Sequence, residues 1–222
     1  MANQVLVVGA SRGIGLEFVR QYRADGFAVW ATARRDEDLA HLRELGATPL
    51  KLDVTDAASA SGLAWQIDGC AFDTAIVNAG VNARSRGLAP PTEAVFDQVM
   101  RTNVLGPMRV IAQLGDALAP QARLAVLSSR MGSIGARASD SDWLYRASKA
   151  AVNSVLKDAS LALAGRAICA SLHPGWVRTD MGGAGADIDV ATSVAGMRQL
   201  LAGLQPEHNG GYFNYDGQTI PW

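Results

Sequence analysis

Near its N-terminus the chain carries Gln4-Val-Leu-Val-Val-Gly-Ala-Ser-Arg-Gly-Ile-Gly15, a predicted strand joined to a predicted helix by three glycines. Gln4–Val8 is a short apolar run typical of a buried strand, and the glycines follow at G-x-x-x-G-x-G spacing. Glycines permit a tight turn and a close approach of phosphate, while a helix N-terminus offers free N–H groups. The segment predicts nucleotide binding, although the commoner spacing is G-x-G-x-x-G and a turn without a ligand is the alternative.

Short apolar runs and longer segments of helical period alternate along the whole chain. The other predicted strands are Ala28–Thr32, Thr48–Leu52, Thr74–Asn78, Ala122–Ser128, Ala167–Leu172 and Gly211–Asn214. The predicted helices are Ile14–Asp25, Asp36–Glu44, Ala57–Ile67, Thr92–Leu118, Trp143–Ala164 and Val190–Leu204. Strict alternation implies right-handed βαβ units. We therefore predict the α/β class, with one doubly wound Rossmann domain over residues 1–222, a mostly parallel seven-stranded sheet and helices on both faces.

Composition argues against several classes of function. The 222 residues include 20 basic and 21 acidic side chains, a net charge of −1, which gives no argument for nucleic acid or an anionic membrane surface. No apolar run approaches the ~18 residues of a membrane span, and the N-terminus lacks a basic segment followed by an apolar one. Cys70 and Cys169 belong to no metal-binding cluster. We expect a cytoplasmic enzyme or binding protein without a metal, nucleic-acid or membrane partner.

The second and third predicted strands end in residues suited to the adenosine part of a dinucleotide. An acidic residue after the second strand would accept from the 2′-hydroxyl of NAD, but Arg34 stands there. Arg34, helped by Arg12, is suited to a 2′-phosphate, so we expect NADP(H); arginines that merely face solvent are the alternative. Asp53 ends the third strand and could meet the adenine amino group or cap the helix near Asp56.

Tyr145 and Lys149 stand four residues apart in Tyr145-Arg-Ala-Ser-Lys149, at the start of a predicted helix. Positions i and i+4 share one face of a helix, so the ammonium would lie beside the phenol. A neighbouring cation stabilises the phenolate and lowers a tyrosine pKa from its usual value near ~10. Such a tyrosine can exchange a proton with a carbonyl or alcohol oxygen, whereas a solvated helix face is the alternative for this pair alone.

Together these residues resemble the short-chain dehydrogenase/reductase superfamily, in order and over essentially the whole chain. The matching residues are Gly9, Gly13, Gly15, Asp53, Asn78-Ala79-Gly80, Asn103, Ser129, Tyr145, Lys149, Pro174-Gly175 and Thr179. The segment from His173 to Met181 and the ending Tyr215-Asp-Gly-Gln-Thr-Ile-Pro-Trp222 are similar to the C-factor and sniffer-type carbonyl reductases. The subgroup resemblance rests on loop and tail similarity.

The resemblance implies a catalytic set of Asn103, Ser129, Tyr145 and Lys149. Tyr145 would give a proton to the carbonyl oxygen, Ser129 would polarise that carbonyl, and Asn103 would hold a water that links Lys149 to solvent. Together with the arginines discussed above, the implied NADP(H) site comprises Gly9, Ser11, Arg12, Gly13, Ile14, Gly15, Arg34, Asp53, Val54, Asn78, Ala79, Gly80, Tyr145, Lys149, Pro174, Gly175, Val177 and Thr179. Thr179 would meet the nicotinamide carboxamide.

The position of the catalytic serine departs from the family pattern. The family usually separates serine and tyrosine by about a dozen residues, a spacing that Ser133 satisfies, whereas Ser129 precedes Tyr145 by sixteen. We favour Ser129 because it follows directly on a predicted strand, which sets its direction. The extra residues, 136–142, are expected to form a polar loop beside the site.

The resemblance implies an NADPH-dependent oxidoreductase that reduces a ketone or aldehyde to an alcohol. A nucleotide-binding signalling or regulatory protein of the C-factor type, with little or no turnover, is the alternative. Homodimers or homotetramers formed through the two longest predicted helices are usual in the family. Gly182–Asp189 stands where the family carries its substrate lid, and because this segment is short and lacks bulky apolar residues, we expect an open or shallow substrate site.

Overall fold

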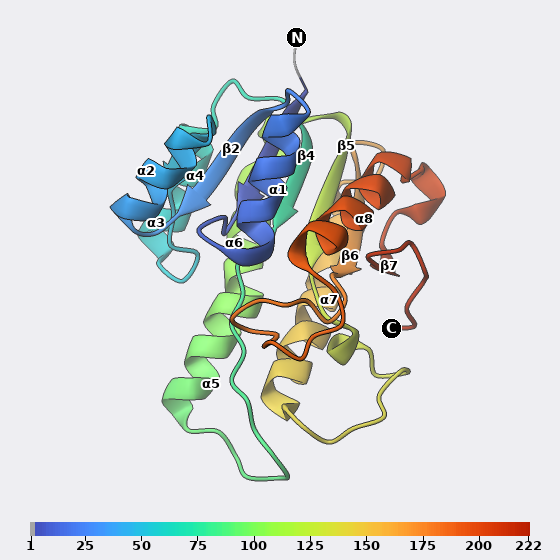
Figure 1. The fold of residues 1–222 in the computed structure, drawn as a ribbon. Coiled ribbons are helices and arrows are strands. Elements are labelled where there is room, and N and C mark those ends of the chain that lie inside the picture. The colour runs from blue at the N-terminus through green and yellow to red at the C-terminus, as the bar shows by residue number, and fades with distance from the viewer. Residues whose placement is uncertain (1–2) are drawn as a thin grey trace.

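Seven parallel strands form the centre of the computed structural model, which describes residues 3–222 (Figure 1). They are β1 Gln4–Val8, β2 Ala28–Ala33, β3 Thr48–Lys51, β4 Phe72–Val77, β5 Leu118–Leu127, β6 Ala167–His173 and β7 Gly211–Asn214. Their order across the sheet is β3-β2-β1-β4-β5-β6-β7, and every neighbouring pair is parallel. The predicted α/β doubly wound fold is confirmed.

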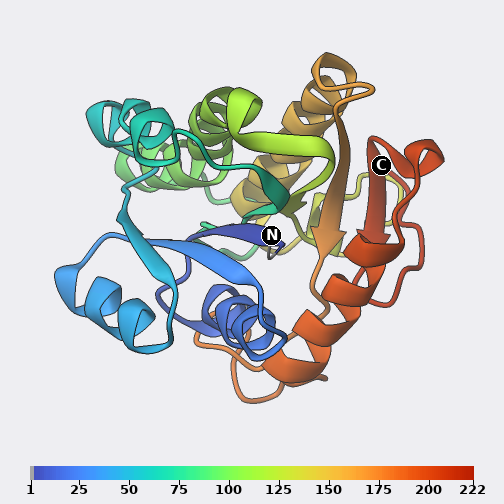
Figure 2. The same ribbon diagram turned by 90° about the horizontal axis from the view of Figure 1, so that it is seen from above.

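Helices cover both faces of the sheet, as the view from above shows (Figure 2). They are α1 Gly13–Ala24, α2 Asp36–Glu44, α3 Ala57–Ser61, α4 Leu63–Gln66, α5 Glu93–Met100, α6 Gly106–Leu114, α7 Trp143–Ala162 and α8 Val190–Gly203. Helices α1, α2 and α8 share one apolar core with the sheet, whereas α4, α6 and α7 share another on the opposite face.

Strand β1 explains why both faces are covered. Its alternate residues point to opposite faces, so Val5 and Val7 join the core under α1 and α8, while Leu6 and Val8 join the core under α6 and α7. All four side chains are completely buried. A strand that is apolar on both faces is stable only between two helical layers.

The predicted helix Thr92–Leu118 is wrong in two respects. A π-helical segment, Arg101–Leu105, separates α5 from α6 and carries Asn103. Leu118 is a strand residue, because it pairs with Phe72 at the start of β5. The predicted helix Ala57–Ile67 is likewise divided, into α3 and α4, at Gly62.

The topology brings the carboxyl ends of the strands to one edge of the sheet, the lower edge in Figure 1. The chain leaves β1 toward β2 and β3 and then returns to place β4 on the other side of β1. Such a switch point opens a crevice beyond the strand ends, where ligands bind in open α/β sheets. Within residues 3–222, no helix is long and apolar enough to cross a membrane.

Candidate active site

Two adjoining cavities lie beyond the carboxyl ends of the strands. One, of about 550 Å³, extends along the glycine turn, and we call it the nucleotide cavity. The other, of about 800 Å³, lies between the loops that follow β4, β5 and β6, and we call it the outer cavity. Tyr145, Pro174 and Thr179 line both, so the predicted proton donor stands where the two spaces meet. The outer cavity is partly open to solvent, in agreement with the open site expected from the short lid segment.

The glycine turn leaves no room for side chains. Gly9 has φ +86°, and a Cβ on it would lie 2.8 Å from the Cα of Ala79. A Cβ on Gly15 would lie 2.1 Å from the carbonyl oxygen of Gly9. The Asn78 amide donates to that same oxygen at 2.6 Å, which ties the turn after β1 to the end of β4. The bare backbone at the start of α1 therefore forms a cradle suited to a phosphate group.

Most residues predicted to bind the cofactor line the nucleotide cavity. These are Gly9, Ser11, Arg12, Gly13, Ile14, Arg34, Asp53, Val54, Asn78, Ala79, Gly80, Tyr145, Lys149, Pro174 and Thr179. Three do not. Gly175 and Val177 line only the outer cavity, and Gly15 lines neither because it packs against Gly9 and Asn78.

The two arginines predicted to bind a 2′-phosphate differ in their contacts. Arg34 is exposed, lines the nucleotide cavity and forms no ion pair within the described part of the chain. Its neighbour Arg35 is paired with Glu37 and Asp38 on α2. Arg12 forms an ion pair of 2.5 Å with Asp180, from the loop after β6, on the opposite side of the cavity. Only Arg34 is available to an anion without first breaking an ion pair.

Asp53 does not cap α3. That helix is capped by Asp56, whose carboxylate accepts from the Ser59 N–H at 2.6 Å. Oδ1 of Asp53 instead accepts from the N–H and hydroxyl of Thr55, at 2.9 and 2.7 Å. Burial acts to raise the Asp53 pKa, but these bonds and the charge of Arg34 outweigh it, and the pKa lies below its usual value. Asp53 is therefore ionised at neutral pH, as an acceptor for an amino group must be.

Tyr145 and Lys149 lie on the buried face of α7, one turn apart. The Lys149 Nζ lies 5.7 Å from the centre of the Tyr145 ring and donates to the Leu127 carbonyl at 2.8 Å. Burial lowers the pKa of Lys149 to about 8. It also raises the pKa of Tyr145 to about 12, against a smaller lowering by the hydrogen bond with Ser129. The expected lowering of the Tyr145 pKa is wrong for this structure, since exclusion of solvent dominates.

Asn103 is held in place by the loop after β4. Its amide oxygen accepts from the Val81 N–H at 2.8 Å, and its amide nitrogen donates to the Val81 carbonyl at 2.8 Å and to the Ser148 hydroxyl at 3.0 Å. A Cβ on Gly80 would lie 3.4 Å from both the Asn103 Oδ1 and the Lys149 Nζ. The two polar side chains therefore flank the same glycine, although Asn103 itself lines neither cavity.

The two candidate serines have different surroundings. Ser129 lines the outer cavity, as Tyr145 does, and its hydroxyl oxygen accepts from the Met131 N–H at 3.2 Å. Its carbonyl accepts from the buried hydroxyl of Tyr212, on β7. Ser133 is completely buried, donates to the Pro221 carbonyl and accepts from the Ala136 N–H at 3.0 Å. Ser133 thus anchors the C-terminal segment, which explains why it lies away from Tyr145 despite its favourable spacing.

The outer cavity also contains residues that the sequence reasoning did not select. They are Arg84 and Arg86 from the loop after β4, Arg130 directly after Ser129, and Asp142 at the end of the 136–142 loop. Their place after strand ends was a signal that could have identified the arginines. His173, Trp176 and Met181, from the segment similar to the C-factor and sniffer-type reductases, also line this cavity. Burial, and then the charge of Arg130, lower the pKa of His173 to about 4, so it is neutral at physiological pH.

Comparison with known proteins agrees with this geometry. The family model of short chain dehydrogenases matches residues 3–187. C-signal of Myxococcus xanthus is 39% identical over 153 residues, which cover 68% of this chain and 92% of that protein. A short-chain dehydrogenase/reductase structure from Burkholderia multivorans with bound NADP matches 100% of both chains, with a TM-score of 0.91 and 31% identity. The carbonyl reductase Sniffer of D. melanogaster also matches 100% of both chains, with a TM-score of 0.89 and 29% identity.

Proposed function

The chain belongs to the short-chain dehydrogenase family, and from that premise we propose that it is an NADPH-dependent reductase of ketones or aldehydes. The observation that carries the proposal is the position of Tyr145, where the nucleotide cavity meets the outer cavity. A proton donor at that junction can reach a carbonyl oxygen held in one cavity while the cofactor lies in the other. The reaction is reversible hydride transfer with Tyr145 as general acid or base.

The nucleotide cavity fits NADP(H) in both shape and charge. The glycine cradle at the start of α1 suits the pyrophosphate, Arg34 the 2′-phosphate, and Asp53 the adenine amino group. Ala79 and Gly80 leave space for a ribose, and Thr179 lies at the junction of the cavities, where the nicotinamide belongs. When bound, the cofactor supplies the hydride, and the protein supplies position and electrostatics.

Tyr145 is suited to donate a proton at neutral pH. Because its pKa is about 12, the phenol stays protonated, as the general acid of carbonyl reduction must be. Ser129 lines the outer cavity together with Tyr145, and in this proposal its hydroxyl donates to the same carbonyl oxygen as negative charge develops there.

Lys149 and Asn103 are proposed to return the proton to Tyr145. The pKa of Lys149, about 8, allows the ammonium to release and regain a proton near neutral pH. Asn103 and Lys149 lie on either side of Gly80, and hydrogen bonds to Val81 and Ser148 hold the Asn103 side chain in place. Asn103 can therefore position a water beside the ammonium. Neither residue needs to touch the substrate for this role.

Replacement of Arg34 tests the preference for NADPH. We expect Arg34→Asp to raise the Kd for NADPH by about 30-fold or more, since a charge-assisted contact is lost and a repulsion is added. The Kd for NADH should change by less than about threefold. Arg35→Asp is the matched control, because Arg35 lies outside the cavity lining and its change should leave both constants nearly unaltered. Equal losses for the two cofactors would contradict the assignment.

Replacement of the two serines tests which one polarises the carbonyl. Ser129→Ala should lower kcat/KM by about 10²-fold through loss of a donor to the developing oxyanion. Ser133→Ala should keep most of the activity but lower the free energy of unfolding by about 1–2 kcal/mol, because Pro221 and Ala136 lose their buried partner. Steady-state kinetics and urea unfolding of both variants measure these effects. The opposite pattern would identify Ser133 as the catalytic serine.

The similarity to C-signal supports a second candidate, a nucleotide-binding signalling protein with little turnover. NADPH oxidation across a panel of aldehydes and ketones distinguishes the two. Carbonyl-dependent oxidation supports the reductase, whereas tight NADPH binding without turnover on any carbonyl supports the signalling role. Tyr145 and Ser129 are both buried side chains that line the outer cavity, which favours chemistry, since a binding module would have no use for a desolvated proton donor there.

We further propose that the protein is a cytoplasmic homodimer or homotetramer. Phe96 on α5, Met108 on α6 and Leu161 on α7 are large apolar side chains that are about half exposed or more. These helices cover one face of the molecule, on which a second copy could bury them (Figure 2). Light scattering of the purified protein measures the oligomeric state, and a monomer at micromolar concentration would contradict this proposal.

A further inference from the structure

The lining of the outer cavity carries an excess of positive charge. Arg84, Arg86 and Arg130 line it, and Asp142 is the one carboxylate among the lining residues. Oδ1 of Asp142 accepts from the Ser85 N–H at 2.6 Å, which joins the 136–142 loop to the loop after β4. His173 adds no charge at neutral pH, because its pKa is about 4.

None of these three arginines forms an ion pair with a carboxylate of residues 3–222. Arg84 donates to the Met181 carbonyl at 2.9 Å and so keeps its full charge. Arg86 and Arg130 are exposed, and no side-chain hydrogen bond satisfies their guanidinium groups within the described residues. Elsewhere between residues 3 and 222 some exposed arginines are paired, as Arg35 is with Asp38, and others, such as Arg34, are not. Guanidinium groups that lack a carboxylate partner can bind an anion without first breaking an ion pair.

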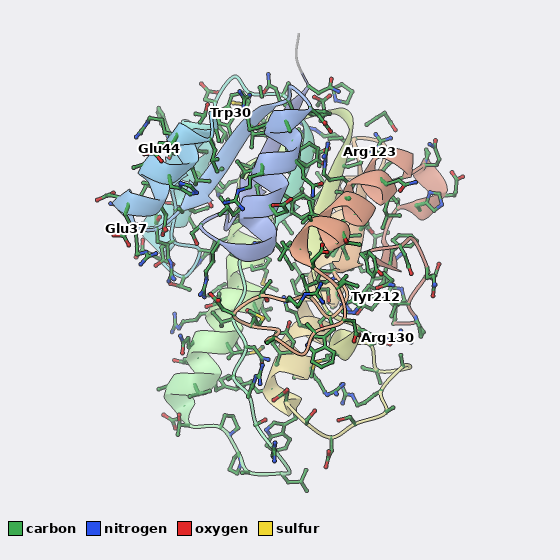
Figure 3. All side chains as sticks on the ribbon, in the orientation of Figure 1. Trp30, Glu37, Glu44, Arg123, Arg130 and Tyr212 are labelled. Atoms are coloured by element: carbon green, nitrogen blue, oxygen red, sulfur yellow. The ribbon has the colours of Figure 1, made fainter. Side chains whose placement is uncertain are left out.

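Arg130 is the best placed of the three. It follows Ser129 directly and begins the short 3₁₀ turn Arg130–Gly132, which sets its position relative to the proposed oxyanion donor. Figure 3 shows it beside Tyr212 at the lower end of the sheet. Its positive charge acts to lower the pKa values of both His173 and Tyr212, while Asp216 opposes it at His173. Asp216 lies outside the cavity lining and accepts from the Gln218 N–H at 3.1 Å.

Apolar side chains provide the other part of the cavity. Trp176 is half exposed and is held by a hydrogen bond of 2.9 Å from its Nε1 to the Gly182 carbonyl, and Met181 and Ile14 lie in the same lining. The cavity thus has an arginine beyond Ser129 and apolar side chains toward the loop after β6. This lining is suited to a ligand that has an anionic group at one end and an apolar body. The volume of about 800 Å³ accommodates a molecule of this kind.

We propose that the substrate is a carbonyl compound that bears a carboxylate or phosphate group, bound through Arg130 with help from Arg84 and Arg86. This inference rests on the proposed reductase function and adds the class of substrate to it. The arginine contact lies away from the reacting carbonyl, so it acts on recognition of the substrate. A guanidinium group binds either anion through paired charge-assisted hydrogen bonds.

Matched aldehydes test the proposal. The anionic substrates are 4-carboxybenzaldehyde and 4-formylphenyl phosphate, and the neutral one is methyl 4-formylbenzoate. The wild-type protein should have a higher kcat/KM for an anionic aldehyde than for the ester, and whichever anion is preferred identifies the group. In Arg130→Gln the ratio of the two kcat/KM values should fall about tenfold or more. Raising the ionic strength should lower the same ratio in the wild type.

Arg137→Gln is the matched control. Arg137 lies in the same loop region and is exposed, but it does not line the cavity, so its change should leave the ratio within about twofold. An unchanged ratio in Arg130→Gln, whether both activities fall or neither does, would overturn the proposal. So would a wild type that prefers the ester.

A binding measurement separates this proposal from the reductase function. Terephthalate has the same charged end but no reducible carbonyl, so calorimetric titration into the NADP⁺ complex reports the anion site without turnover. Binding that weakens about tenfold in Arg130→Gln supports the anion site even if no aldehyde is reduced. Reduction of the ester together with no measurable binding of terephthalate would overturn the anion site and leave the reductase function standing.

Discussion

Tyr145→Phe lowers kcat for carbonyl reduction by about 10²- to 10⁴-fold, the range that general acid catalysis contributes. The variant loses only a hydroxyl, and the ring continues to fill its place on the buried face of α7. The phenol of wild-type Tyr145 is protonated at neutral pH, because its pKa is about 12, and it is the proton source in the proposed reaction. Stopped-flow measurement of NADPH oxidation at saturating aldehyde determines the effect on kcat.

The structure offers a matched control for the Tyr145 experiment. Tyr22 is also a buried tyrosine, but it lies on α1 and lines neither cavity. Tyr22→Phe should therefore leave kcat within about twofold at a temperature where the variant is folded. The Kd for NADPH should differ little between Tyr145→Phe and the wild type, since the glycine cradle and Arg34 are untouched. A Tyr145→Phe variant with nearly full turnover would contradict the proposed role of Tyr145 as the proton donor.

Lys149→Met separates stability from activity. Lys149 is buried where it lines the nucleotide cavity. Its only hydrogen-bond partner within residues 3–222 is the Leu127 carbonyl, and no carboxylate there forms an ion pair with it. Its pKa is lowered to about 8 because the folded state disfavours the ammonium. The methionine side chain has a similar length and no charge to desolvate. We expect kcat/KM to fall by about 10²-fold or more, while the free energy of unfolding at neutral pH does not fall with it.

The lowered pKa of Lys149 determines how the stability difference between Lys149→Met and the wild type changes with pH. Below about pH 8 the lysine is charged in both the folded and unfolded states, and the desolvation cost is present in full. Between about pH 8 and the unfolded value near 10.5 the unfolded state binds more protons, so the contribution of Lys149 to stability rises with pH. The stability of Lys149→Met relative to the wild type should therefore decrease by about 2 kcal/mol between pH 7 and pH 9.5.

Urea unfolding of both proteins at the two pH values measures this change. Only the difference between the proteins is informative, because the raised pKa values of Cys169 and Tyr212 affect both equally. Lys157→Met is the matched control, since Lys157 is exposed on the same helix, two turns beyond Lys149. Its difference from the wild type should not vary with pH. A difference for Lys149→Met that stays constant from pH 7 to pH 9.5 would mean that the ammonium is not desolvated in the folded state.

Much of the site was predictable because its parts are local in sequence. The glycine turn follows its strand directly, and the strand ends carry Arg34 and Ser129 to the same edge of the sheet. The division of the Thr92–Leu118 helix was not predictable, because Leu118 is in β5 only through its pairing with Phe72. The contact of Ser133 with Pro221 likewise joins residues 88 positions apart. No local pattern reports such a partner.

The sequence alone determined the fold class, the family resemblance and the Tyr145–Lys149 pair, since alternating strands and helices predict a parallel sheet with helices on both faces and four residues span about one turn of α7. The tertiary structure decided how that pair is charged. The helices and loops that surround it exclude solvent, so burial lowers the pKa of Lys149 and raises that of Tyr145, where a neighbouring cation alone would have lowered the tyrosine pKa. The same loops bring three arginines from two segments to one cavity. Solvent exclusion and charge density depend on neighbours distant in sequence, and only the folded chain assembles them.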